Sequence, residues 1–112
     1  MAENEKYITD FLTNNNVQSA LITNKAGDVI FAINLTHDES IAAMSSAIVS
    51  MCTKFIEDLE KDRLKQMLLK TGGGLVIFSI INNDEVLVVF ADEGANIGMF
   101  LHQADILAQK LN

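Results

Sequence analysis

The chain has 112 residues and a mass of 12.3 kDa, so we expect one domain over residues 1–112. Hydrophobic residues make up 49% of it, which suffices for a packed core and argues against disorder. The net charge of −7 disfavours a nucleic-acid partner, because binding to phosphates needs a basic surface.

Three features favour a cytoplasmic protein. Cys52 is the only cysteine, so it cannot form an intramolecular disulfide, and this fits a reducing compartment. The segment from Met1 to Lys6 is polar and acidic, unlike a signal peptide. No apolar run reaches the roughly 18 residues of a membrane span, so we expect no direct membrane insertion.

The first part of the chain predicts a helix followed by two strands. Apolar residues recur at helical spacing within Glu3–Asn14. Val17–Thr23 alternates like a strand, and Val29–Leu35 is rich in β-branched and aromatic residues. The turn Asn24–Asp28 between them contains Gly27, which suits a positive φ. We therefore expect a hairpin here.

A long middle helix is predicted from about Glu39 to Lys61. Thr36 and Glu39 have the spacing of a capping box, and Asp38 is the alternative N-cap residue.

The second half of the chain predicts three strands and a final helix. The composition of Leu64–Thr71 suits a helix as well as a strand, and we expect a strand. Gly72-Gly73-Gly74 interrupts the pattern, and the apolar runs Leu75–Ile81 and Val86–Ala91 follow as a hairpin. The last helix is expected over Asn96–Leu111.

The expected architecture is an α/β fold of three layers. The last two strands are apolar on both faces, and such strands are covered on both faces. We therefore expect a five-stranded, mostly antiparallel sheet, with the middle helix on one face and the two terminal helices on the other.

The middle helix has two uncharged faces, which is unusual for a surface helix. We assign its large apolar stripe to the core: Ile41, Met44, Ile48, Met51, Cys52, Phe55 and Leu59. The other side carries small residues: Ala42, Ala43, Ser46, Ala47, Ser50 and Thr53. Small residues permit close packing of a second helix, so we expect a partner chain here. A helix that simply favours alanine, or one shielded by a loop, is the alternative.

The strand Leu64–Thr71 is a second candidate contact surface. It holds Met67-Leu68-Leu69 in a row, and as an edge strand it would expose unpaired backbone groups. Lys65 and Lys70 are the alternative, as charges that block such pairing. Val29–Leu35 is equally apolar, so the pairing edge stays open. The candidate interface therefore comprises Ala42, Ala43, Ser46, Ala47, Ser50, Thr53, Lys54, Lys65, Met67, Leu68 and Leu69.

The residues predict no catalytic, metal or cofactor site. A strand follows Gly72–Gly74, whereas a phosphate-binding loop leads into a helix. His37 and His102 lie far apart, and zinc ligands at the usual spacing do not occur. Cys52, on an apolar stripe, is expected to be inert. We therefore expect a protein that is not an enzyme and has no cofactor.

Across nearly its whole length the chain resembles the roadblock family of small dynein-light-chain-type domains. The resemblance rests on the element order and on three features: the Gly27 hairpin, the Ala42–Ala47 segment, and Val88–Asp92 followed by Ala95–Gly98. It implies a roadblock/profilin-like fold with the strand order 2-1-5-4-3. It further implies dimers in which the third strand pairs with its copy and the central helices lie side by side, burying Ala43 and Ala47.

In that family, prokaryotic members bind small Ras-like GTPases through the helical face, and eukaryotic members are adaptors in dynein and in lysosomal scaffolds. The resemblance thus implies a non-enzymatic homodimer that binds and regulates or scaffolds a small Ras-like GTPase. Arg63 lies past the helix end, so an arginine finger is not expected. The alternatives are a subunit of a heterodimeric scaffold or motor adaptor, and a small-ligand sensory domain using Ser19, Thr23 and Ser79.

Overall fold

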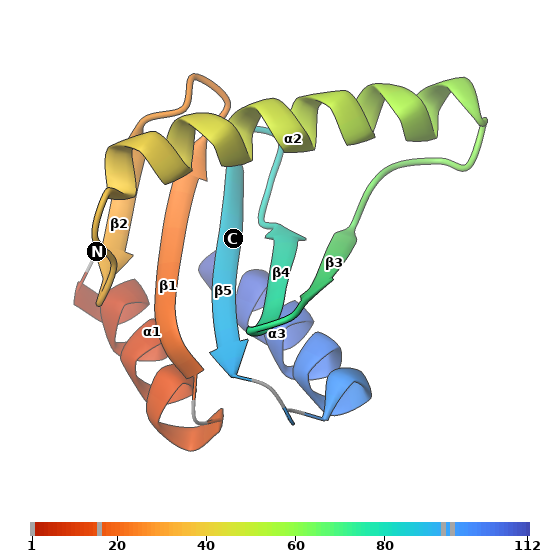
Figure 1. Ribbon diagram of the computed structural model, residues 1–112. Coiled ribbons are helices and arrows are strands. Elements are labelled where there is room, and N and C mark those ends of the chain that lie inside the picture. The colour runs from red at the N-terminus through yellow and green to blue at the C-terminus, as the bar shows by residue number, and fades with distance from the viewer. Residues whose placement is uncertain (1, 16, 93, 95) are drawn as a thin grey trace.

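The computed structural model describes residues 2–15, 17–92, 94 and 96–112, with the backbone alone for residues 2 and 3; Ala95 lies outside this set. The elements follow the predicted order (Figure 1). They are α1 (Ala2–Asn15), β1 (Val17–Asn24), β2 (Val29–Ile33), α2 (Asp38–Asp58), β3 (Gln66–Thr71), β4 (Gly74–Ile80), β5 (Glu85–Asp92) and α3 (Ile97–Leu111).

The strands form one sheet in the order β2-β1-β5-β4-β3, as the resemblance implied. Each of the four pairings is antiparallel. The segment of ambiguous composition is a strand, because Gln66 to Thr71 pair continuously with Ser79 to Gly74 of β4. Its other side has no strand partner within the described chain, so β3 is an edge strand.

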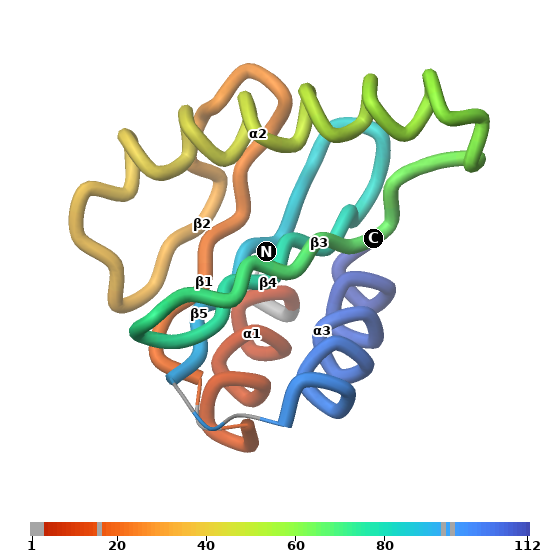
Figure 2. Tube along the Cα trace, turned by 45° about the vertical axis from the view of Figure 1, so that its right-hand side comes forward, coloured from red at the N-terminus to blue at the C-terminus, as the bar shows by residue number. Residues whose placement is uncertain are grey.

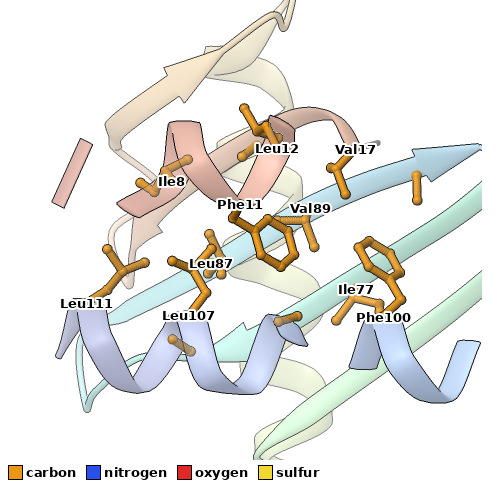
Figure 3. Close-up of a cluster of buried hydrophobic side chains, with 14 of the residues drawn as sticks. Ile8, Phe11, Leu12, Val17, Ile77, Leu87, Val89, Phe100, Leu107 and Leu111 are labelled. Atoms are coloured by element: carbon orange, nitrogen blue, oxygen red, sulfur yellow. The ribbon is translucent and has the colours of Figure 1, made fainter. Parts of the chain in front are cut away.

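The sheet lies between two helical layers, with α2 on one face and α1 with α3 on the other (Figure 2). Under α1 and α3, the side chains of Ile77, Leu87 and Val89 pack against Ile8 and Leu107 (Figure 3). The alternate residues of the same strands, such as Phe78 and Val88, belong to the cluster under α2. Both faces are therefore covered, as the pattern predicted.

The ends of α2 differ from the prediction. Its N-cap residue is His37, with φ of 57° and no side-chain cap, so the predicted capping box of Thr36 and Glu39 is wrong. Asp38 is the first helical residue, and its Oδ1 accepts the backbone N–H of Glu39 instead. The helix ends at Asp58, before Lys61, because Glu60 and Asp62 adopt positive φ angles that a helix cannot contain.

The glycine segment forms a tight connection between β3 and β4. Gly74 has φ of +149°, and a side chain there would overlap the carbonyl oxygen of Ala91 on the neighbouring strand β5. A Cβ on Gly73, by contrast, would have no neighbour within 4 Å. Only one of the two glycines is thus required by the sheet.

We predict that Gly74→Ala lowers the free energy of unfolding by about 1–3 kcal/mol, the cost of backbone strain, and that Gly73→Ala changes it by less than about 0.5 kcal/mol. Urea denaturation at one fixed protein concentration measures both. Equal effects of the two substitutions would contradict this geometric reason.

Candidate functional site

The face of α2 that packs on the sheet differs from the predicted one. The buried residues of the helix are Ala42, Ser45 and Val49, whose exposed fractions are 0%, 3% and 9%. The large apolar residues that we assigned to the core are exposed instead. This apolar stripe consists of Met44 (56% exposed), Ile48 (37%), Met51 (74%), Phe55 (62%) and Leu59 (49%). The predicted core stripe is therefore wrong, apart from the half-buried Ile41 and Cys52 at its margin.

The reason is the close approach of α2 to β1. The side chain of Thr23 is fully buried, and its hydroxyl oxygen lies 3.0 Å from the carbonyl oxygen of Asp28 and 3.5 Å from that of Ala42. At such a distance between strand and helix backbone, only small side chains fit in the contact. Ala42 and Ser45 therefore face the sheet, and the large residues cannot.

The β1–β2 turn adds a second close contact. A Cβ on Gly27 would lie 3.2 Å from the Cα of Ala43. The hydroxyl of Ser46 donates a 2.6 Å hydrogen bond to the carbonyl oxygen of Lys25. A loop of the same chain thus shields part of the small-residue side. This is the alternative that the sequence analysis left open beside a partner chain. For Ala42, the expectation of an open face is wrong.

The remaining small residues stay accessible. Ala43, Ala47, Ser50 and Lys54 are exposed and follow one another along the side of α2 that points away from the sheet; we call them the outer strip. Lys54 forms an ion pair of 2.9 Å with Asp58. Thr53 is half-buried beside them. Nothing within the described chain covers the outer strip beyond Gly27.

The edge strand adds apolar surface on the same side of the sheet as α2. Met67 packs at the margin of the cluster under α2, and the next residue on this face, Leu69, is 41% exposed. Leu69 is paired with Val76, which is paired with Phe90, and both of these are half-buried. We call Leu69, Val76 and Phe90 the sheet row.

The other predicted residues of this strand lie elsewhere. Leu68, which we placed in the candidate interface with Met67 and Leu69, faces α1 and α3 and packs against their cluster. Lys65 is exposed just before β3, and its carbonyl oxygen accepts the backbone N–H of Ile80. Lys65 therefore lies at the edge of the sheet without blocking strand pairing there.

The C-terminal turns of α2 extend past β3, beyond the edge of the chain's own sheet (Figure 1). The helix makes its main strand contacts with β1 and β2, at the opposite side of the sheet. Phe55 and Leu59, near the end of α2, are thus exposed over a sheet edge that is itself unpaired. The apolar stripe, the sheet row and this edge together form one candidate protein–protein interface.

The polar residues named for a sensory cavity serve the fold instead. The hydroxyl of Ser19 donates to the carbonyl oxygen of Asn34 at 2.7 Å, and that of Ser79 accepts the amide of Gln66 at 2.9 Å. Together with Thr23 they are engaged at separate places and do not converge on a cavity. Among the residues described, no cluster of three His, Cys, Asp or Glu side chains could hold a metal ion, and no helix is suited to span a bilayer.

The Roadblock/LC7 domain family matches residues 3–91, and the chain belongs to this family. Its fold is similar to that of Myxococcus xanthus MglB, with a TM-score of 0.90 at 14% identity over 97% of this chain and 91% of that one. It is also similar to the gliding protein mglB from Thermus thermophilus, with a TM-score of 0.86 at 13% identity over 96% and 84%. A Roadblock/LC7 domain from Streptomyces avermitilis gives 0.72 at 24% identity over 94% of both chains. No curated protein matches the sequence.

The close packing of α2 on β1 leads to a prediction. Ala42→Leu should lower the free energy of unfolding by about 1–3 kcal/mol, because the added atoms overfill the contact with β1. Ala47→Leu, on the outer strip, should change it by less than about 0.5 kcal/mol. Thermal or urea denaturation distinguishes the two. A larger effect at Ala47 than at Ala42 would mean that α2 is rotated about its axis so that Ala47, and not Ala42, faces the sheet.

Proposed function

We propose that the chain is a non-enzymatic regulatory module of the cytoplasm that forms a homodimer and binds a small Ras-like GTPase. The observation that carries the proposal is the exposed apolar stripe of α2. A soluble domain rarely leaves such a contiguous patch in water unless it is a contact surface.

The energetics favour a partner on this stripe. Burying a Met, Ile, Phe or Leu side chain contributes about 1.5–3 kcal/mol each relative to leaving it in water. The five residues of the stripe range from 37% to 74% exposed, so about half of that contribution is still available. The sheet row adds three more apolar side chains with accessible surface.

A second copy of the chain fits this surface. Two β3 edges can pair about a two-fold axis, so that the two sheets continue into one, and each strand then covers the unpaired backbone groups of the other. The part of α2 that extends past β3 would then lie over the partner's sheet. The apolar stripe of each helix would be buried against the partner's helix and sheet row. The pairing of the β3 strands agrees with the assembly that the family resemblance implies, whereas the two helices would meet through the apolar stripe and leave Ala43 and Ala47 accessible.

The outer strip supplies the surface for the GTPase. In the proposed dimer, Ala43, Ala47 and Ser50 point away from both the sheet and the second copy. Their small side chains let another protein approach the helix backbone closely. Binding at this helical face is what the family resemblance implies for prokaryotic members.

Such a module would position the GTPase's own switch loops without supplying a catalytic group. Arg63, the single arginine of the chain, is exposed in the loop between α2 and β3 and not on the outer strip. It would therefore not reach a nucleotide bound above Ala47.

We predict that Phe55→Glu raises the dissociation constant of the homodimer by roughly 30-fold or more. A hot-spot residue at the centre of an interface contributes about 2 kcal/mol, and a buried carboxylate adds a further cost. Light scattering on a size-exclusion column, over a dilution series from micromolar concentration, measures the shift.

His102→Glu is the matched control, since His102 is exposed on α3, on the far face of the sheet, and the same charge there should leave the dimer intact. A wild-type chain that stays at 12.3 kDa at micromolar concentration would overturn the homodimer. It would favour pairing with a different roadblock chain.

A separate prediction concerns the outer strip. Ala47→Arg should leave the dimer mass unchanged and weaken binding of the cognate Ras-like GTPase about tenfold or more, because the long side chain blocks close approach. Biosensor titrations with Ras-like GTPases of the same genome, loaded with GDP or with a non-hydrolysable GTP analogue, test it. Equal affinity of Ala47→Arg and wild type would move the GTPase to another surface.

A further inference from the structure

The outer edge of β3 presents its backbone groups at alternate residues (Figure 1). The register of β3 and β4 continues to Lys65 and Ile80, and the backbone N–H of Ile80 donates a 2.9 Å hydrogen bond to the carbonyl oxygen of Lys65. In an antiparallel pair, residues that exchange hydrogen bonds with the neighbouring strand alternate with residues that do not. The N–H and C=O groups of every second residue after Lys65 therefore point away from β4. We call these the outward residues: Gln66, Leu68 and Lys70.

A second copy can satisfy the outward residues in only a few registers. Two β3 strands related by a two-fold axis run antiparallel, and each outward residue must lie opposite an outward residue of the other copy. All of them find a partner when Leu68 lies opposite Leu68 of the second copy, which places Gln66 opposite the second copy's Lys70. A shift by two residues in either direction leaves one outward residue of each β3 without a partner in the other β3.

The side chains favour the same register. On the face that carries α2, it places Met67 opposite Leu69 of the second copy, and on the other face Leu68 meets its own copy at the axis. A shift in one direction would instead place Leu68 opposite Lys70, and a shift in the other would place it opposite Gln66. Side chains that lie directly opposite each other are in contact. Only the central register therefore matches apolar with apolar side chains on both faces.

Gln66 and Lys70 are complementary in their hydrogen-bonding groups. The Nε2 of Gln66 donates to the hydroxyl oxygen of Ser79 and to the carbonyl oxygen of Leu101, both at 2.9 Å. Both amide hydrogens are thus used, and Oε1 accepts no hydrogen bond from the described residues. Lys70 is exposed, can only donate, and likewise has no partner within the described chain.

We propose that Gln66 and Lys70 set the register of the homodimer, with the ammonium group of each Lys70 donating a hydrogen bond to Oε1 of Gln66 on the second copy. This inference rests on the homodimer proposed above. It gives Lys70, which by sequence alone could equally block strand pairing, the opposite role. Any other chain would need the same donor and the same acceptor to pair in this register, so the contact favours a second copy of this chain.

Disulfide trapping measures the register directly. Met67→Cys and Leu69→Cys are made in a Cys52→Ala background, which removes the native cysteine, and are oxidised alone and as an equimolar mixture after subunit exchange. The proposed register places the two different positions directly opposite, about 4.5–5.5 Å apart, whereas identical positions are diagonal neighbours about 7–8 Å apart, beyond the reach of a disulfide.

We expect the mixture to give at least about fivefold more cross-linked dimer on a non-reducing gel than either variant alone. Equal cross-linking of Met67→Cys alone, or of Leu69→Cys alone, would reveal a shifted register. Either result would overturn this proposal and leave the homodimer standing.

A charge reversal tests the contact itself. Lys70→Glu places a carboxylate before the Oε1 acceptor of Gln66, so it should raise the dissociation constant of the homodimer about tenfold or more in a light-scattering dilution series. Lys65→Glu is the matched control, because it makes the same change of charge just before β3 and outside the proposed contact. It should stay within about threefold of the wild type.

The outcomes separate this proposal from the homodimer. Equal effects of Lys70→Glu and Lys65→Glu, or no effect of Lys70→Glu, would overturn the role of Lys70 while the wild-type mass still shows a dimer. A wild-type chain that stays monomeric would overturn both. Circular dichroism spectra that match the wild type show that each variant is folded, so a change in mass then reports on association alone.

Discussion

The close contact between α2 and the β1–β2 hairpin is the constraint on which the rest of the structure depends. Ala42 lies against the buried Thr23, and the Cα of Ala43 approaches Gly27. Because this contact admits only small side chains, it decides which face of the helix meets the sheet. The large apolar residues of α2 are then left on the outside, where they are free to bind a partner.

That division gives each side of one helix a different task. The small buried residues hold α2 to its own sheet, and in the dimer that we propose the apolar stripe and the overhanging C-terminal turns contact the second copy. The sheet row lies beside the unpaired edge of β3, on the face of the sheet that carries α2. One partner could therefore cover the apolar stripe of α2 and pair with β3 at the same time. The opposite flank of α2 borders a groove that is lined by both apolar and polar side chains.

Most of the fold could be predicted from local pattern. The element order, the hairpin at Gly27, the β4–β5 hairpin and the three layers follow from periodicity and turn residues, which act over a few neighbours. The strand order came from the family resemblance. The errors in the fold concern the two ends of α2. A positive φ at Glu60 ends the helix before Lys61, and a positive φ at the N-cap residue His37 takes the place of the capping box expected at Thr36.

The candidate site was predicted only in part. The sequence by itself determined that α2 has a small-residue side and a large apolar side, that neither is charged, and that β3 carries Met67 and Leu69. Only the tertiary structure decided that Ala42, Ser45 and Val49 pack inward, while the large apolar side and most of the small-residue side stay accessible. Hydrophobicity alone places Met44, Met51 and Phe55 in the core, because burying large apolar surface is favourable. The distance between α2 and β1 overrides this preference, and that distance depends on contacts between Thr23 and Ala42, 19 residues apart, which no local pattern records.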